Sequence, residues 1–369
     1  MRTILKPSLL ATLGVFATAS MAHHGSNGQF DTTKEIQVSG VVTDIKLVNP
    51  HSYVYFDVTN EDGSVDPWRC ELRGGSLLKR TGWSSEMFAT GTELTIDGAP
   101  ARREEFGCMV QTITFADGRI VGRNDVLNAD EENAAAAPVV TKLADGTPNF
   151  NGNWAAAQES PGGPGGPGAM GAGGMGAMGA DGGMGPGGMG GGGPQYTLTD
   201  AGEAASAGFE SADNPRYHCK ATNIFHDWWF DQNVNMIEQT NDKIVMTYGF
   251  MDIVRTIHLD MDSHPADIVP SIAGHSIGSW DGDTLVVDTV GFSEGYLDGR
   301  GGVKHSSALH TVERMSLSED GETLTIDYTG EDPLYLVGSF TGTRDVLRTN
   351  DAFQPYECDD LTEEIVPGF

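Results

Sequence analysis

Two adjacent histidines near the start of the chain could form a metal site. Residues 1–22 resemble a secretory signal peptide, with a basic start, an apolar run and a small-residue cleavage pattern ending at Ala22. Cleavage there would free the α-amino group of His23 beside its own imidazole and that of His24. Borderline ions such as Cu²⁺ favour these nitrogens. We therefore expect a copper site with His51 as a third ligand; the alternative is a flexible terminus that binds metal adventitiously.

A second set of candidate residues, in the last third of the chain, could bind a small ligand. The set comprises Arg255, His264, His275, His305, His310 and Glu313. Residues two apart on a strand share a face, so His310 and Arg314 should point one way and Glu313 the other. An inward-facing pair of such groups could orient a polar ligand or act as acid and base. The alternative is that they stabilise turns at the rim or surface.

Four cysteines fit two disulfides in an oxidising compartment. Four cysteines allow three pairings, and the sequence alone does not choose between them. We expect Cys70–Cys108 and Cys219–Cys358, because each bond then stays within one proposed domain.

Composition limits the partners and the location. The 369 residues contain 22 Lys and Arg against 52 Asp and Glu, a net charge of −30. Such a surface repels phosphate backbones, so nucleic-acid binding is not expected. After the signal, no apolar run approaches the roughly 20 residues that cross a bilayer. We expect a periplasmic or secreted protein with no membrane anchor.

Residues 23–124 predict a small β-barrel. Strands are expected at 36–45, 53–58, 68–72, 92–96 and 110–115, with a short helix at 76–80. Five strands with a helix between the third and fourth are typical of an OB-like barrel.

The rest of the chain predicts a second barrel, which makes the fold class all-β with two small antiparallel barrels. Residues 125–144 read as a linker and 145–160 as the entry to the second domain. Residues 161–194 hold 19 glycines and five methionines, typical of a disordered insertion. Its thioethers could trap Cu(I), although a plain linker explains the composition better. About eight strands within 195–369, with a turn at 281–283 and the last strand at 335–344, suggest a lipocalin-like barrel with room for one small ligand.

Both halves contain motifs that resemble known families. The N-terminal motifs are Ala22-His23-His24-Gly25, Asn49-Pro50-His51, Arg80-x-Gly82-Trp83 and Asp117-Gly118-Arg119. Over roughly residues 22–121 they resemble DUF6152, a secreted bacterial family of unknown function. The later motifs include Gly274-His275-Ser276-Ile277-Gly278-x-Trp280 and Gly282-Asp283-Thr284. They resemble an uncharacterised family of secreted bacterial lipocalin-like barrels. Neither resemblance implies a reaction.

Three functions remain open from the sequence. The first is a binding protein, with copper at the mature N-terminus and a small ligand in the second barrel. The second is a periplasmic hydrolase or isomerase that uses histidine and glutamate of that barrel. The third is an envelope scaffold whose barrels contact other proteins.

Overall fold

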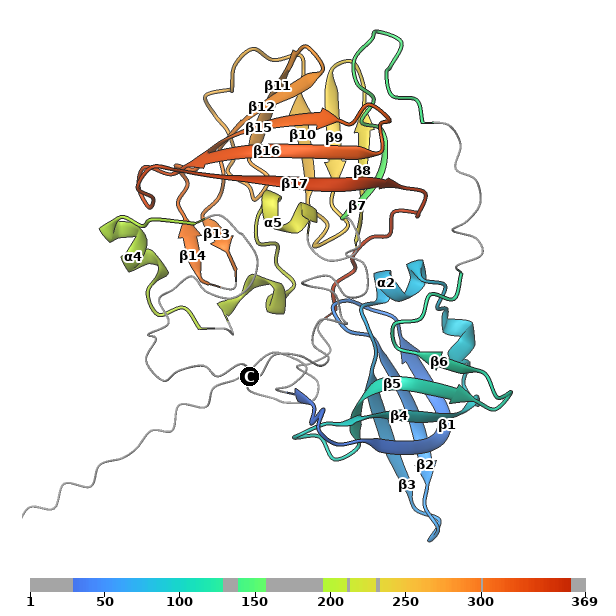
Figure 1. Cartoon of the computed structure of the whole chain (residues 1–369). Helices are drawn as coiled ribbons and strands as arrows, with labels where there is room; N and C mark the ends of the chain where they lie inside the picture. The colour runs from blue at the N-terminus through green and yellow to red at the C-terminus, as the bar shows by residue number, and fades with distance from the viewer. Residues whose placement is uncertain are drawn as a thin grey trace, which may run out of the picture.

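Strands dominate the structure and form two closed barrels (Figure 1). The computed structural model describes residues 29–128, 139–156, 195–210, 213–229, 233–299 and 301–359. The expected signal peptide and the Gly/Met-rich segment lie outside the described residues, as do His23 and His24.

The N-terminal barrel has the strand order expected from the sequence. Its strands are β1 (Ile36–Lys46), β2 (Tyr53–Thr59), β3 (Val65–Glu71), β4 (Glu93–Pro100), β5 (Gly107–Phe115) and β6 (Ile120–Gly122). They pair in the order β3-β2-β1-β4-β5-β6, and a parallel β3–β5 pairing closes five of them into a barrel. Helix α2 (Gly75–Arg80) and the 3₁₀ helix η1 (Ser85–Phe88) lie between β3 and β4 in the chain. The strand β6 was not predicted.

The C-terminal barrel has nine strands instead of about eight. They are β7 (Gly152–Ala156), β8 (Val234–Gln239), β9 (Lys243–Thr247), β10 (Val254–His258), β11 (His275–Asp281), β12 (Thr284–Val290), β15 (His310–Leu317), β16 (Thr323–Glu331) and β17 (Ser339–Thr349). The extra strand is β7, which pairs with both β17 and β8. All neighbours in this barrel are antiparallel except β10 and β11, which are parallel.

Smaller elements lie at one end of this barrel. They are α4 (Asp200–Ser206), η3 (Pro215–His218), α5 (Ile224–Trp229) and the hairpin of β13 (Gly295–Asp298) and β14 (Val303–His305). In Figure 1, α4 lies beside this hairpin, and α5 lies at the lower end of the barrel. Phe225 and Trp228 of α5 pack on Tyr328 and Tyr248, with ring centroids 4.2 and 4.9 Å apart. The helix α5 therefore covers that end of the barrel with aromatic side chains.

Several strand boundaries differ from the sequence prediction, among them the start of the last strand. The last strand was expected to begin at Tyr335, but β17 begins at Ser339. The backbone N–H groups of Tyr335 and Leu336 instead donate to the carbonyl of Asp332, which makes a turn. The side chain of Asp332 also accepts from Ser306, so the turn is anchored inside the fold.

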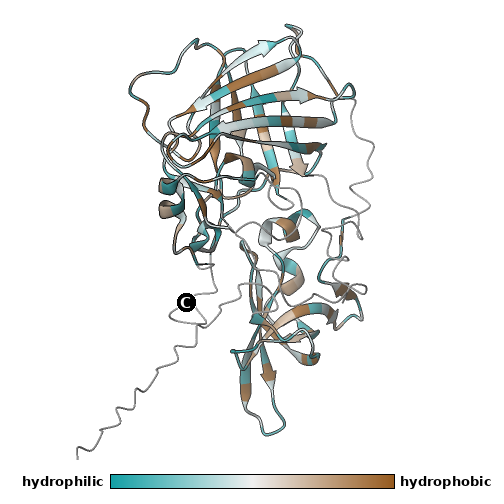
Figure 2. Ribbon diagram, turned by 60° about the vertical axis from the view of Figure 1, so that its left-hand side comes forward, coloured by the Kyte–Doolittle hydropathy of each residue, from teal (hydrophilic) through white to brown (hydrophobic). Residues whose placement is uncertain are grey.

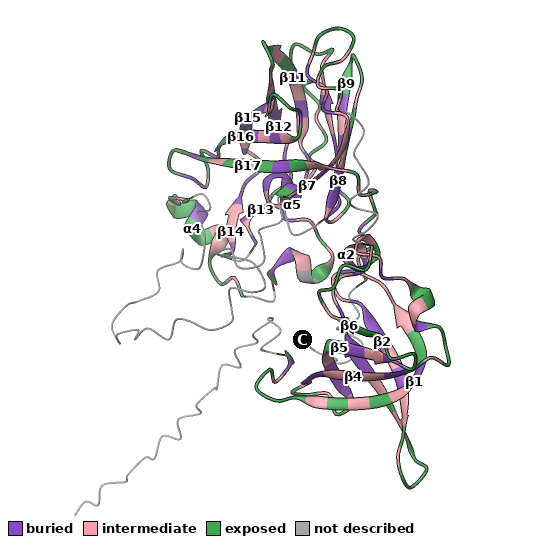
Figure 3. Ribbon diagram, turned by 45° about the vertical axis from the view of Figure 1, so that its right-hand side comes forward, coloured by how far each residue is buried: buried purple, intermediate pink, exposed green. Residues whose placement is uncertain are grey.

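Each barrel encloses its own apolar core. Along β12, Leu285 and Val287 are buried while Val286 and Asp288 are only partly covered, which is the alternation of a strand with one face inward. The same alternation of hydropathy and burial is visible along many strands of both barrels (Figures 2 and 3). Large side chains such as Trp154 and Met246 fill the second core. The interior of that barrel is therefore largely packed.

Both expected disulfides are confirmed. Cys70–Cys108 joins β3 to β5, and Cys219–Cys358 joins the segment after η3 to the end of the described chain. Two disulfides indicate an oxidising compartment outside the cytoplasm. Within the described parts of the chain, no helix combines the length and apolar character needed to span a membrane.

The C-terminal segment after β17 contacts the N-terminal barrel at Asn49. The Asp359 N–H donates to the Asn49 carbonyl over 2.7 Å, and the Asn49 side chain donates to the Tyr356 carbonyl. Residue Asn49 also forms a parallel bridge with Cys358. The second disulfide therefore fixes a segment that reaches the loop carrying His51.

Candidate functional sites

His51 lies just before β2, with one ring nitrogen held by a buried carboxylate. Its Nδ1 lies 3.3 Å from Oε1 of Glu71, whose side chain is 2% exposed, whereas 41% of the His51 side chain is exposed. Arg123 contacts the same Oε1 over 3.2 Å. Burial alone would raise the pKa of Glu71, but His51 and Arg123 outweigh it and hold the pKa below its usual value. Glu71 is thus a carboxylate that can orient the His51 ring and leave Nε2 for a ligand.

The structure does not bring the six expected ligand-binding residues of the second barrel together. It places Arg255 and Glu313 inside the barrel, three histidines on its outer side, and His305 apart from both groups. The prediction that His310 and Glu313 face opposite ways is confirmed, because Glu313 is buried while His310 is partly exposed.

The inner group is a buried ion pair. Glu313 and Arg255 are 2% and 1% exposed, and Arg255 Nη1 donates to Glu313 Oε1 over 3.0 Å while Nη2 donates to Oε2. Nε and Nη2 of Arg255 also donate to Ser276 and Thr289, over 3.0 and 2.9 Å. Burial would lower the pKa of Arg255, but Glu313 reverses the shift, so the guanidinium stays charged. This network joins β10, β11, β12 and β15 from within.

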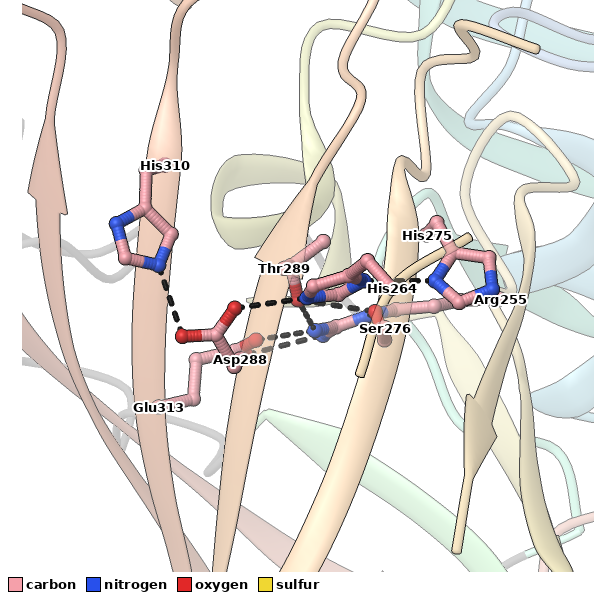
Figure 4. A network of polar contacts seen from close by, with 8 residues as sticks. All are labelled: Arg255, His264, His275, Ser276, Asp288, Thr289, His310 and Glu313. Atoms are coloured by element: carbon pink, nitrogen blue, oxygen red, sulfur yellow. Dashed lines mark hydrogen bonds and ion pairs between the residues drawn. The ribbon is translucent and has the colours of Figure 1, made fainter. Parts of the chain in front are cut away.

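The outer group is a chain of side chains on the opposite side of the same strands (Figure 4). The carboxylate of Asp288 contacts His310 Nε2 through one oxygen and His264 Nε2 through the other, each over 2.8 Å. His264 Nδ1 faces His275 Nδ1, also over 2.8 Å. The ring of His258 stacks on that of His275, with centroids 5.1 Å apart.

The hydrogen bonds determine which ring nitrogens carry the protons in the outer group of histidines. An ionised carboxylate only accepts, so the contacted nitrogens of His264 and His310 donate to Asp288. In the neutral His264 ring, Nδ1 is then the acceptor, and His275 Nδ1 carries the hydrogen. Burial, followed by the charges of His258 and His264, lowers the pKa of His275. Burial would raise the pKa of Asp288, but the hydrogen bonds from His310 and His264 outweigh it and lower the pKa.

His305 belongs to neither group. It lies at the end of β14, is 2% exposed, and its Nδ1 is 3.0 Å from the Ser306 carbonyl. Its ring packs edge-on against Phe292. Burial lowers its pKa, so His305 is a neutral core histidine near pH 7.

Four contributors to these groups were not expected from the sequence. Ser276 and Thr289 complete the inner network. Asp288 and His258 belong to the outer one. Strand alternation carried a signal for three of them. Ser276 and Thr289 each directly follow an outward-facing residue on their strand, so they face inward. His258 lies three residues from the inward-facing Arg255, so it faces outward. The alternation along each strand does not give the pairing register between strands. This register determines which side chains of different strands meet.

Comparison with known proteins gives one family match. Residues 11–109 match the model of DUF6152, described as a family of unknown function. This confirms the expected resemblance of the N-terminal part and says nothing of the C-terminal barrel. A search of curated proteins gave no match.

Proposed function

We propose that this chain is an exported binding protein that holds a copper ion at its mature N-terminus and a small ligand in its C-terminal barrel. The observation that carries the copper site is the contact between His51 Nδ1 and the buried carboxylate of Glu71. Metal-ligating histidines usually donate their other ring N–H to a carboxylate, which fixes the ring and strengthens the ligand. The disulfides support export, because they require an oxidising compartment.

In the proposed copper site, four nitrogen donors of two kinds, an amine and three imidazoles, come from two parts of the chain. The α-amino group and imidazole of His23 and the imidazole of His24 would come from the processed terminus, and His51 Nε2 from the barrel. Amine and imidazole nitrogens suit Cu²⁺, and the acidic chain favours a cation. A terminal amine binds only when deprotonated, so copper affinity should fall on acidification.

Copper titration of the processed protein tests this site. We expect one tight Cu²⁺ whose affinity falls about 10–100-fold in Glu71→Gln, because this change removes the carboxylate behind His51 and keeps the size of the side chain. One extra alanine ahead of His23 is the matched control for the terminal amine, because every side chain remains. Equal copper affinity in the processed, Ala-extended and His51→Ala proteins would contradict the proposal.

The barrel ligand is supported by two buried polar atoms that lack partners. Within the described residues, Thr311 Oγ1 and Trp228 Nε1 are buried and make no hydrogen bond. Buried donors in native proteins are nearly always paired, so a small polar molecule could supply the missing acceptors. Native mass spectrometry of the secreted protein should detect such a molecule, and Trp228→Phe should weaken its retention. A native mass spectrum that shows only the mass of the polypeptide, recorded under conditions that preserve non-covalent complexes, would contradict the ligand.

The second candidate is a hydrolase or isomerase, now centred on His310. The observation that favours it is Asp288, which holds Nε2 of a half-exposed imidazole as a carboxylate holds a general base. The buried Arg255–Glu313 pair is less suited, because both groups already bind each other. A panel of chromogenic esters tests this candidate. Hydrolysis by wild type that is lost in His310→Ala would support an enzyme, and equal rates for the two proteins would oppose it.

A further inference from the structure

Three imidazoles converge on the outer wall of the C-terminal barrel. His258 ends β10, His275 begins β11, and His264 lies in the segment that connects these two parallel strands. The ring centroid of His275 lies 5.1 Å from that of His258 and 5.1 Å from that of His264. Two imidazoles bound to one tetrahedral ion with bonds of about 2.0–2.1 Å have their centroids about 5 Å apart. His264 and His275, whose rings are tilted by 73°, therefore have the spacing of two ligands around a shared ion. His258 lies at the same distance from His275, but the two rings are stacked with an interplanar angle of 13°.

Independently of this spacing, Asp288 prepares His264 as a ligand. Its carboxylate accepts from His264 Nε2 over 2.8 Å, which leaves the lone pair on Nδ1. That Nδ1 faces His275 Nδ1 at 2.8 Å. Carboxylate–histidine pairs of this kind commonly support metal ions in proteins.

We propose that His258, His264 and His275 form a second metal site, for a borderline divalent ion such as Zn²⁺. It goes beyond the copper site at the N-terminus and does not depend on it. All four cysteines are in disulfides, so the donors are imidazoles, which suit this class of ion. A fourth position stays open to water, as in three-histidine zinc sites.

Binding requires three small rearrangements. Among the residues that the structure describes, no three His, Cys, Asp or Glu side chains already surround one point. The nitrogens of His264 and His275 must separate to about 3.3 Å, the spacing of two ligands on one tetrahedral ion. The Nδ1 hydrogen of His275 moves to its Nε2, so no net proton is released. His258, with a 29% exposed side chain, must turn its ring out of the stack with His275.

Calorimetric titration of the full processed chain with Zn²⁺ tests the site, with Co²⁺ as a spectroscopic probe. Wild type should bind one Zn²⁺ through these residues, and Co²⁺ should give the intense visible bands of a tetrahedral ion. His264→Ala and His275→Ala should each weaken this binding at least tenfold, and Asp288→Asn by about 10–100-fold. Circular dichroism establishes that each variant remains folded.

Two controls separate this site from the others. His310→Ala removes the other imidazole on Asp288 but keeps the carboxylate behind His264, so it should lower Zn²⁺ affinity less than Asp288→Asn does. His51→Ala should impair Cu²⁺ binding at the N-terminus and leave the Co²⁺ bands intact. Folded His264→Ala and His275→Ala proteins that bind Zn²⁺ like wild type would overturn the second site, whatever the outcome at His51.

Discussion

The inner and outer sides of the C-terminal barrel use the same strands for different kinds of polar chemistry. Inside, Arg255 and Glu313 are fully removed from water and bind each other with two hydroxyls in support. Outside, Asp288 and His310 are 38% and 43% exposed and remain accessible to solvent. Burial, more than residue type, therefore distinguishes a polar network that is structural from a polar network that a ligand can reach.

The largest expected effect comes from breaking the inner pair on one side. Glu313→Gln removes the negative charge and leaves the guanidinium of Arg255 buried without a counter-ion. Removing one partner of a buried pair costs about 3–5 kcal/mol. Chemical denaturation should show this loss in the unfolding free energy. The matched outer variant Asp288→Asn should lose far less, and equal losses would refute the contrast.

Removing both inner charges should restore most of that stability. Arg255→Met combined with Glu313→Leu replaces the pair with apolar side chains of similar length. Such replacements of buried pairs are often neutral or stabilising, so the double variant should unfold within about 1 kcal/mol of wild type. A double variant no more stable than Glu313→Gln would mean that the hydroxyls of Ser276 and Thr289 depend on the charges.

An intermediate effect should follow from pH. Burial lowers the pKa of both His305 and His275 from the ordinary value of 6.5. The unfolded chain therefore binds protons first as the pH falls. The contribution of these two histidines to the stability of the fold is complete above about pH 6.5 and is lost on further acidification. Melting temperatures should fall between about pH 7.5 and 5.5. In His305→Gln, the melting temperature should fall less steeply with pH than in wild type. An equal fall in the two proteins would show that His305 does not contribute to the pH dependence of stability.

The smallest effect should come from the outer imidazole. His310→Ala removes a half-exposed ring whose bond to Asp288 lies on the solvent side. Exposed ion pairs contribute about 0–1 kcal/mol, so the unfolding free energy should change by less than about 1 kcal/mol. A loss comparable to that of Glu313→Gln would show that the outer chain is structural.

The features that the sequence predicted well are those with a local cause. The period of two along a strand was enough to place Glu313 inward and His310 outward. The turn residues at Asp281 and Gly282 bounded β11 and β12 within a residue or so. Both disulfides followed from the division of the chain into two barrels.

The features that the sequence did not predict depend on register between distant strands. Arg255 meets Glu313 only because β10, β11, β12 and β15 are neighbours in the closed barrel. His258 and His275 stack only because β10 and β11 run parallel, while an antiparallel meander was expected. Pairing of this kind is a tertiary property that no single segment determines.

The pairing of β7 affects how the barrel depends on the length of the chain that follows this strand. The strand is held by hydrogen bonds to β8 and β17, so its place in the barrel does not depend on the length of the connection that leaves it at Ala156. Doubling a flexible loop costs only about 0.6 kcal/mol of closure entropy. The pairing with β8 and β17 is therefore what holds β7 in the barrel, and a change in the length of that connection would leave these hydrogen bonds intact.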